Sequence, residues 1–511
     1  MSRSRVIPID SSDLSLRDVA DVASGFASIR LAEDELRETV SHSAEVVRDW
    51  VDQGRRVYGI TTGFGSSCDN AIPRDVLEQL AVNLPRYHGC GIGPLLSEEQ
   101  SAAVLLTCIR AMARGVSGVR YAVIERMAEL LERRLLPVIP AIGSVGASGD
   151  LTPMSYVVAV LIGEREVYVD GEVRPASILS DLHLPPLSLG PKESLALMNG
   201  TSAMTGLMCL AWRRAERLAR LSAALSAAAV DVLHGQAAHF DARIFEAKPH
   251  SGSRLAARWI REDLGVENHP DPHGGRIQDV YSLRCSPHVI GALLDGLRFA
   301  KEVVEVELNG SSDNPIVDPQ RREPLHGGNF YGGHIAMVAD LVKSGVANLG
   351  DLADRQLALL NDPRTNRGLP ENLVAVDGDA RVAHHGFKAM EISASALAAE
   401  ALKLTMPASV FSRSTEGHNQ DKVSMGTLAV RDCNTILDLV ETSHVIHLLA
   451  LCQAADLRGI GSASPRTRLL HEAVRQRIPI NSADRRMDQD IATLLAMYRA
   501  DELPVGEDQA R

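Results

Sequence analysis

Residues 141–150, AIGSVGASGD, hold three glycines, two alanines and two serines before the first ionisable side chain, Asp150. Within this stretch, Ala147, Ser148 and Gly149 form a tripeptide that could react with itself. The backbone nitrogen of Gly149 could attack the carbonyl carbon of Ala147 and close a five-membered ring, because a residue without Cβ bends tightly and exposes its nitrogen. Loss of one water from this adduct and of a second from Ser148 would leave an exocyclic methylene, a strong electrophile. The alternative is an ordinary Gly/Ser turn before a helix.

Widespread catalytic motifs do not explain these residues. The stretch is not a GxSxG nucleophile elbow, because Asp150 stands where the second glycine belongs. The earlier cluster HGCGIGP (88–94) does not fit GxGxxG, and neither GxxxxGK[ST] nor HExxH occurs in the chain. His326, His334 and the pair His384–His385 lack a carboxylate at the spacing of metal ligands. We therefore expect no metal site.

The longer stretch GSVGASGDLTPMSYVVAVLIGEREV resembles the signature of the histidine and aromatic amino acid ammonia-lyases and aminomutases. In that family Ala-Ser-Gly forms the prosthetic group 4-methylideneimidazol-5-one (MIO). Six further blocks are similar to those of the family and stand in its order: VYGITTGFG (57–65), LMNGTSAMTG (197–206), IQDVYSLRC (277–285), GSSDNPIVD (310–318), HGGNFYGG (326–333) and HNQDKVSMGT (418–427). The resemblance implies elimination of ammonia from an α-amino acid, which gives a trans-α,β-unsaturated acid.

The resemblance also implies roles for single residues. Tyr58 matches the catalytic base, on a Gly/Thr loop that can close as a lid. A phenol has an ordinary pKa near ~10, so it needs cationic or dipolar neighbours for this task. Arg284 matches the clamp of the substrate carboxylate, which a planar guanidinium grips with two hydrogen bonds.

The other matched residues surround the same chemistry. Packing or structural roles are the alternative for Tyr58, Asn199 and Phe330. The implied roles are Asn199 as hydrogen-bond partner of MIO and substrate, Tyr281 beside MIO, Phe330 packed on MIO, Gln278 and Asn314 as supporting residues, and Glu416, three residues before Asn419, as a contact of the amino group.

Two places bear on the identity of the amino acid. Gln420 is neutral where histidine enzymes carry a glutamate that can pair with imidazole, and the Asn419–Gln420 pair is typical of aromatic enzymes. Tyr87 and His88 match the pair that lines the pocket for the substrate side chain. His88 could bond a phenol, as in tyrosine enzymes, although histidine enzymes also carry histidine there. We expect conversion of L-tyrosine to trans-4-coumarate, with histidine or phenylalanine elimination, or a 2,3-aminomutase, as alternatives.

Two other classes of protein fit less well. A non-catalytic helical scaffold would have no use for Tyr58, Arg284 and the Ala-Ser-Gly tripeptide together. A lyase of the fumarase kind would carry its own loop signature around a catalytic serine, which this chain lacks.

The elements that must position these residues are mainly helical. The 511 residues are 45% hydrophobic but only 4% aromatic, which favours long, closely packed helices over a sheet sandwich. The Asp-Gly turn within 163–176 predicts a hairpin, and Asp150 is a candidate N-cap for the helix that follows it. Long helices are predicted over about 192–236, 286–309, 329–361, 382–405 and 426–456.

These patterns predict a mainly α fold, a long-helix bundle of the ammonia-lyase (fumarase/aspartase-like) type with a small loop-rich N-terminal region. We expect an N-terminal domain with MIO and the lid over 1–190, a central bundle over 191–460 and a C-terminal helical tail over 461–511. The resemblance implies a homotetramer whose active sites use loops of more than one subunit.

Composition limits the partners and the compartment. A net charge of −12 argues against nucleic acid as the main partner. Seven scattered cysteines without CxxC indicate reduced thiols in a cytoplasmic protein, and the N-terminus lacks the apolar region of a secretory signal. The uncharged stretch 194–212 is interrupted by polar residues, so we expect a buried core helix there and no association with a membrane.

Overall fold

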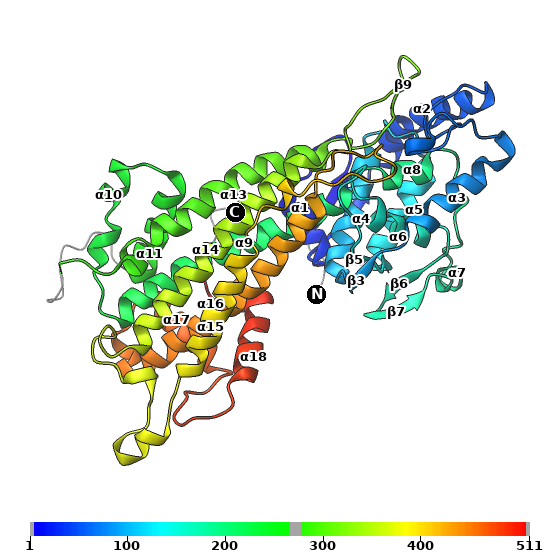
Figure 1. The fold of residues 1–511 in the computed structure, drawn as a ribbon. Coiled ribbons are helices and arrows are strands. Elements are labelled where there is room, and N and C mark those ends of the chain that lie inside the picture. The colour runs from blue at the N-terminus through cyan, green and yellow to red at the C-terminus, as the bar shows by residue number, and fades with distance from the viewer. Residues whose placement is uncertain (1–4, 266–276, 507–511) are drawn as a thin grey trace. The chain divides into compact units, whose positions relative to one another are not determined.

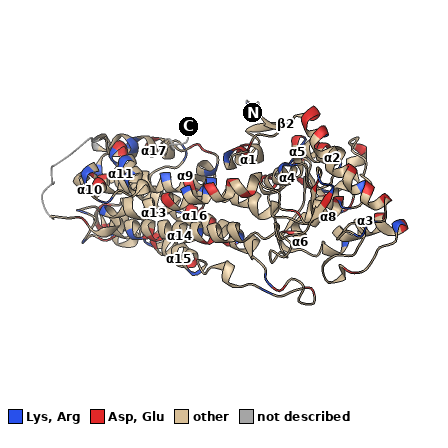
Figure 2. Cartoon of the chain, turned by 90° about the horizontal axis from the view of Figure 1, so that it is seen from above, with Lys and Arg blue, Asp and Glu red and all other residues tan. Residues whose placement is uncertain are grey.

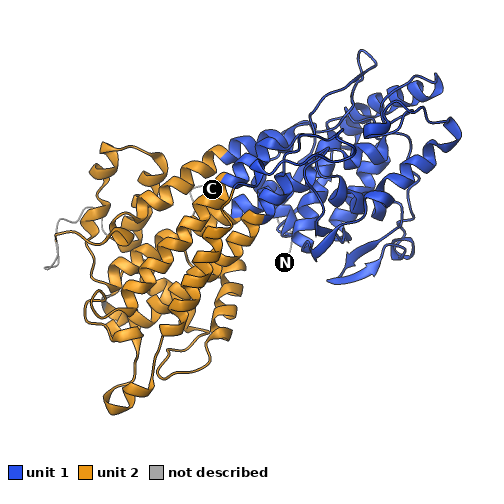
Figure 3. Ribbon diagram, in the orientation of Figure 1, with its two compact units in different colours: residues 1–213, 300–340, 407–431 blue, residues 214–299, 341–406, 432–511 orange. Residues whose placement is uncertain are grey.

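The computed structural model describes residues 5–265 and 277–506, and most of the described chain is helical (Figure 1). Packing divides the chain into two compact units (Figure 3). Unit 1 comprises Met1–Arg213, Ala300–Asp340 and Pro407–Arg431, and unit 2 comprises Arg214–Phe299, Leu341–Met406 and Asp432–Arg511. This division differs from the three consecutive regions expected from the sequence, which stay a prediction.

Helices of very different lengths make up both units. The mainly α fold expected from composition is confirmed. In chain order the helices are α1 Leu16–Ala23, α2 Glu33–Asp52, α3 Leu77–His88, α4 Glu98–Ala113, α5 Tyr121–Glu132, α6 Leu151–Leu161, α7 Ile178–Asp181, α8 Glu193–Met198, α9 Ser202–Val232, α10 Ala242–Ala247, α11 Ser251–Leu264, α12 Tyr281–Arg284, α13 Ser286–Asn309, α14 Gly333–Asn361, α15 Lys388–Lys403, α16 Gly426–Arg458, α17 Pro465–Arg475 and α18 Asp488–Arg499.

Short strands accompany the helices of unit 1. The parallel pair is β1 Arg5–Ile9 with β2 Ala27–Leu31. The antiparallel sheets are β3 Ile92–Leu95 with β5 Pro140–Ile142, β4 Leu136–Pro137 with β6 Glu166–Val169 and β7 Glu172–Pro175, and β8 Ile316–Asp318 with β9 Glu323–Leu325. The pairing of β6 with β7 confirms the predicted hairpin.

The long helices match the sequence pattern with one informative exception. The predicted helix over 286–309 is α13, and 426–456 lies within α16. The predicted single helix over 192–236 is wrong, because α8 ends at Met198 and α9 begins at Ser202. At the break, the Gly200 N–H donates to the Ser148 carbonyl at 3.1 Å, and the Asp150 N–H donates to the Gly200 carbonyl at 2.8 Å. The break therefore places the Gly200 backbone in hydrogen-bonding contact with Ser148 of the reactive tripeptide and with its neighbour Asp150.

Asp150 occupies the predicted N-cap position of α6, but its side chain makes no capping bond to that helix. The prediction of a side-chain cap was wrong because the carboxylate turns to the start of α9, where it accepts the Met204 N–H at 2.8 Å. It also accepts the Thr427 hydroxyl hydrogen. Complete burial raises its pKa to about 6. Asp150 thus ties α6, α9 and α16 together behind the tripeptide.

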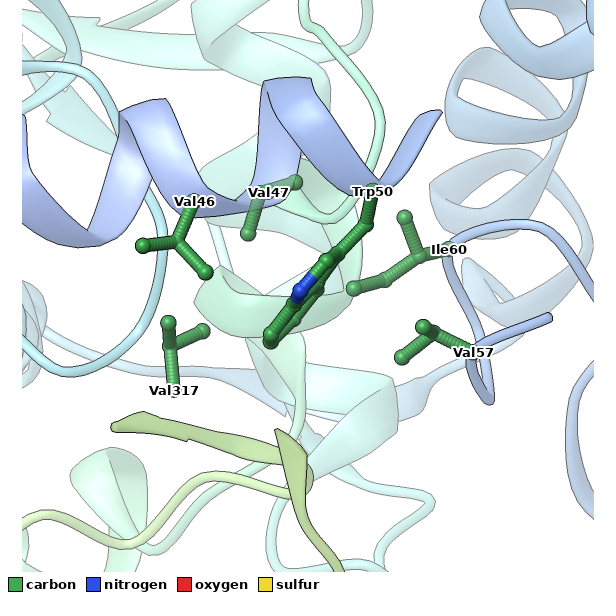
Figure 4. Close-up of a cluster of buried hydrophobic side chains, with 6 residues drawn as sticks. All are labelled: Val46, Val47, Trp50, Val57, Ile60 and Val317. Atoms are coloured by element: carbon green, nitrogen blue, oxygen red, sulfur yellow. The ribbon is translucent and has the colours of Figure 1, made fainter. Parts of the chain in front are cut away.

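The turn that carries Tyr58 is anchored by an apolar cluster in unit 1. Val57 and Ile60, on either side of Tyr58, are buried together with α2 side chains that include Trp50 (Figure 4). Val317 of β8 closes the cluster. Burial of a side chain of this size is worth ~1.5–3 kcal/mol. The cluster therefore fixes both ends of the turn and leaves Tyr58 at its tip.

Charges and apolar helices are distributed as in a packed helical protein. Acidic and basic residues are interspersed along the helices of each unit (Figure 2), and the first turn of α2 carries Glu33, Asp34 and Glu35, which suits the helix dipole. Among the described residues, α16 alone is long and apolar enough to cross a membrane. Of its apolar window, 78% is buried inside the protein, as in a core helix.

Candidate active site

A cavity of about 700 Å³ in unit 1 brings most of the predicted site residues together. They come from six parts of the sequence: the Tyr58 turn, the end of α3, the tripeptide, the α8–α9 break, the region between α13 and α14, and the loop before α16. The predicted residues that line the cavity are Tyr58, Tyr87, His88, Ala147, Ser148, Asn199, Asn314, Phe330, Glu416, Asn419 and Gln420.

The tripeptide lies at the cavity wall in a bent conformation. Ser148 and Gly149 both have positive φ, 49° and 77°. A Cβ on Gly149 would lie 2.0 Å from the Gly200 carbonyl oxygen, so only glycine fits at this position. Gly149 is thus held against Gly200 behind the cavity, while Ala147 and Ser148 face it.

Asn199 offers an unused hydrogen-bond acceptor beside the tripeptide. Its Nδ2 donates to the Asn314 carbonyl at 2.7 Å and lies 3.5 Å from Asp313 Oδ1. Asp313 is in turn held by a buried ion pair with Lys192. The Asn199 Oδ1 is buried and has no hydrogen-bond partner. A buried acceptor of this kind is costly unless a further group bonds it, so Asn199 Oδ1 is available to one more donor.

Asn314 bonds a second segment through its side chain, in addition to the bond that its carbonyl accepts from Asn199. Its Oδ1 accepts the Gly327 N–H at 2.9 Å, which ties it to the loop that leads to Phe330. Phe330 lines the cavity and is half-buried. The supporting position predicted for Asn314 is thus compatible with its contacts.

Tyr58 makes one polar contact in the cavity. Its hydroxyl oxygen accepts the Gly65 N–H at 2.9 Å, and its ring meets the His326 ring edge-on with centroids 6.3 Å apart. Burial raises the pKa of Tyr58, the bond from Gly65 lowers it, and nearby Glu416 raises it further, so the net shift is upward. The activation expected for a base is therefore not supplied by unit 1.

Glu416 connects the Tyr58 turn to the loop before α16. Its Oε1 accepts the Ser66 N–H at 3.2 Å, and its Oε2 accepts the Asn419 Nδ2 at 3.2 Å. Gly65 has a φ of 53°, and a Cβ there would lie 1.7 Å from Glu416 Oε1. The carboxylate therefore closes directly over a glycine that admits no side chain.

The end of α3 places the two predicted pocket residues, Tyr87 and His88, at the cavity wall, with their rings tilted by 37°. Tyr87 and His88 lie with ring centroids 4.4 Å apart, next to buried Leu84. Burial lowers the pKa of His88 to about 4, so its imidazole is neutral near pH 7. Burial also raises the pKa of Tyr87 to about 12. Both tips are thus neutral hydrogen-bonding groups.

Gln420 lies against the tripeptide. Its Nε2 is 3.5 Å from the Ser148 hydroxyl, and its Oε1 accepts the Thr415 hydroxyl hydrogen at 2.7 Å. The Thr415 bond fixes the amide so that its nitrogen faces Ser148. A glutamate here could not present a donor to that hydroxyl.

Three predicted residues belong to unit 2, while every residue that lines the cavity belongs to unit 1. They are Gln278, Tyr281 and Arg284. Arg284 donates through Nε to the Asp279 carbonyl at 3.0 Å and stacks over the Tyr281 ring at 4.6 Å. Tyr281 is 71% exposed. Unit 2 therefore presents a pre-formed aromatic and guanidinium pair at the two ends of the short helix α12.

Some cavity residues were not predicted. His326 lines the cavity, and its place at the start of the block HGGNFYGG is the sequence signal for this position. Phe64 and Lys422 also line the cavity and lie within the blocks VYGITTGFG and HNQDKVSMGT, whereas Cys68 lines it from outside those blocks. Within residues 5–265 and 277–506, no group of three or more His, Cys, Asp or Glu side chains is placed to hold a metal ion.

Comparison with known proteins identifies the class of enzyme to which this helical fold and cavity belong. The model of the family described as aromatic amino acid lyase matches residues 14–476, so this chain belongs to the aromatic amino acid lyase family. It is therefore an enzyme of the ammonia-lyase type, a carbon–nitrogen lyase.

Relatives with different substrates resemble the chain about equally. It is 39% identical to a histidine ammonia-lyase of Geobacillus thermodenitrificans, over 91% of this chain and 92% of that protein. It is 37% identical to a tyrosine ammonia-lyase of Cereibacter sphaeroides, over 93% and 94%. The crystal structure of a tyrosine aminomutase from Streptomyces globisporus superposes with a TM-score of 0.91 at 32% identity, covering 97% of each chain.

Proposed function

We propose that the enzyme eliminates ammonia from L-tyrosine to give trans-4-coumarate, using MIO formed from Ala147, Ser148 and Gly149. The observation that carries the proposal is the shared cavity, in which the bent tripeptide, the Tyr58 phenol and the polar Tyr87–His88 wall face one space. The family relationship supports the reaction type. The substrate rests on the chemistry of the wall.

Formation of the group needs only atoms of the chain. The Gly149 nitrogen bonds to the Ala147 carbonyl carbon, and the carbonyl oxygen leaves as water. A second water takes the Ser148 hydroxyl together with the Cα hydrogen. The positive φ of Ser148 and the absence of Cβ on Gly149 favour this bend. Asn199 Oδ1 and Gln420 Nε2 would hold the group, because one lacks a partner and the other faces Ser148.

When formed, MIO supplies an electrophile that binds the substrate amine and makes ammonia a better leaving group. Tyr58, ionised to the phenolate, would take the β-proton on its phenolic oxygen. Glu416 contacts the amino group, and its negative charge suits an ammonium. The Glu416 contact with Gly65 and Ser66 keeps the Tyr58 turn over the cavity and excludes water.

The substrate carboxylate needs a cation that can donate two parallel hydrogen bonds, and the described lining of the cavity contains no arginine. We assign this role to Arg284 of a second subunit, with Tyr281 and Gln278 beside it, in a homotetramer. The exposure of Tyr281 and the position of the Arg284 guanidinium over its ring support a contact of α12 with another copy of the chain. The positive charge of the Arg284 guanidinium, together with that of the substrate ammonium, would lower the pKa of Tyr58 and so oppose its upward shift. Light scattering should give the mass of four chains.

The side-chain pocket favours a hydroxylated ring. Neutral His88 can bond the substrate phenol without the cost of a buried charge. Gln420, bonded to Thr415, offers no carboxylate to an imidazole substrate. An aminomutase that returns ammonia to the β-carbon remains the second candidate, because the structure of a tyrosine aminomutase superposes over nearly the whole chain.

The experiment is turnover of L-tyrosine, L-phenylalanine and L-histidine by the purified enzyme, followed by ultraviolet absorbance, with chromatography for β-tyrosine. We expect coumarate as the main product and the highest kcat/KM for tyrosine. Urocanate as the fastest-formed product would refute the substrate, and β-tyrosine as the main product would make the enzyme a mutase.

A further inference from the structure

Asp279 of unit 2 is fixed through each of its polar groups, although it was not among the predicted site residues. Its side-chain Oδ2 accepts the Gln236 N–H at 2.7 Å. Its backbone N–H donates to His239 Nε2 at 3.0 Å. Its carbonyl oxygen accepts Arg284 Nε at 3.0 Å. The residue that orients Arg284 is therefore itself held by two further bonds.

Helix α12, which carries Arg284, is also anchored by a residue of α14. Gln356, which is buried, donates through Nε2 to the Ser282 carbonyl at 2.8 Å and to the Ser226 hydroxyl at 3.0 Å. The helix thus has a rigid support on the protein side. On the solvent side, the described residues make no hydrogen bond to the two terminal nitrogens of Arg284.

We propose that His239 and Asp279 are positioning residues that aim the Arg284 guanidinium at a carboxylate. This inference rests on the proposed role of Arg284 in a second subunit. A guanidinium whose Nε is already bonded and whose plane is stacked on Tyr281 has lost much of its rotational freedom. Its two remaining nitrogens then form a fixed fork, and less conformational entropy is lost when a carboxylate binds.

His239 has a specific chemical role in this arrangement. It must be neutral, with its proton on Nδ1, to accept the Asp279 N–H at Nε2. Burial lowers the pKa of His239. Of the two charged groups that act on it, Asp279 raises this pKa and Arg284 lowers it, and the net shift is downward, which favours the neutral ring. A side chain of similar size without an acceptor would release the Asp279 backbone and, through its carbonyl, the Arg284 Nε.

The test compares two ligands that differ only by a carboxylate. We would measure the Kd of trans-4-coumarate and of 4-vinylphenol for wild type, His239→Phe, His239→Gln and Arg284→Lys. We expect His239→Phe to raise the Kd of coumarate about tenfold, as for one lost positioning hydrogen bond, and to leave 4-vinylphenol unchanged. His239→Gln keeps an acceptor and should stay within about threefold of wild type.

Controls separate the positioning role of His239 and Asp279 from the proposed role of Arg284 as the carboxylate clamp. Thermal unfolding and light scattering show whether each variant is folded and assembled, and Asp279→Ala provides a second variant if His239→Phe is not. Equal weakening of both ligands, or no effect of His239→Phe while Arg284→Lys weakens coumarate, would overturn the positioning role and leave the clamp intact. If Arg284→Lys leaves coumarate binding unchanged, the clamp is wrong and the positioning role falls with it.

Discussion

Replacing His88 with phenylalanine should move the preference of the enzyme from tyrosine towards phenylalanine. In the structure His88 is mostly enclosed beside Tyr87, and burial holds its pKa near 4. The bond to a substrate phenol is therefore between neutral groups, worth ~0.5–1.5 kcal/mol, and an unpaired phenol hydroxyl in the mutant costs ~1–3 kcal/mol. The cost of the unpaired hydroxyl, ~1–3 kcal/mol, already includes the lost bond and corresponds to a loss of about one to two decades in the ratio of kcat/KM for tyrosine over phenylalanine.

The assay is kcat/KM for both amino acids, measured from the absorbance of coumarate and cinnamate. Tyr87→Phe is the matched control, since it removes one hydroxyl from the adjacent ring, and we expect a smaller change in the ratio. Because His88 is neutral well above its pKa, the wild-type ratio should not vary between about pH 6 and 9. An unchanged ratio in His88→Phe would refute the idea that His88 recognises the ring.

Three further predictions follow from the same contacts. Tyr58→Phe should keep coumarate binding but lose turnover by orders of magnitude, because only the proton acceptor is removed; near-normal kcat would assign the base elsewhere. Arg284→Lys should lower kcat/KM at least about tenfold, since an ammonium cannot reproduce the two-pronged grip, and kinetics indistinguishable from wild type would contradict this. Burial holds the pKa of His444 near 4 and that of His447 near 3, below the unfolded value of ~6.5, so the unfolded chain binds more protons in acid. The free energy of unfolding should therefore fall as the pH drops from about 6.5 towards 3, and His447→Leu should flatten that dependence in denaturant titrations.

Much of the site could be predicted from the sequence because its residues lie in short blocks whose types are required by the chemistry. Tyr58, Ser148, Asn199 and Glu416 all line one cavity, as expected from those blocks. The long helices were predictable too, since their apolar periodicity is local. Their existence needed no knowledge of distant contacts.

What could not be predicted depends on contacts between distant residues. The helix over 192–236 breaks at Asn199–Gly200, a pair that is a local turn signal, but the bond of Gly200 to Ser148 that uses the break joins residues far apart in the sequence. Asp150 caps α9 instead of α6 for the same reason. The raised pKa of Tyr58 comes from burial and from Glu416, which lies far away in the sequence. Propensity and periodicity carry no information about such contacts.

The intact mass of the purified enzyme tests the central claim most directly. If Ala147, Ser148 and Gly149 cyclise, wild type should be lighter than its sequence by two water molecules, and digestion should place the loss on the peptide that contains residues 141–150. Ser148→Ala has no hydroxyl to lose, so it should not show the loss of the second water and should have no turnover while it remains folded. A wild-type mass equal to that of the unmodified sequence would contradict the account.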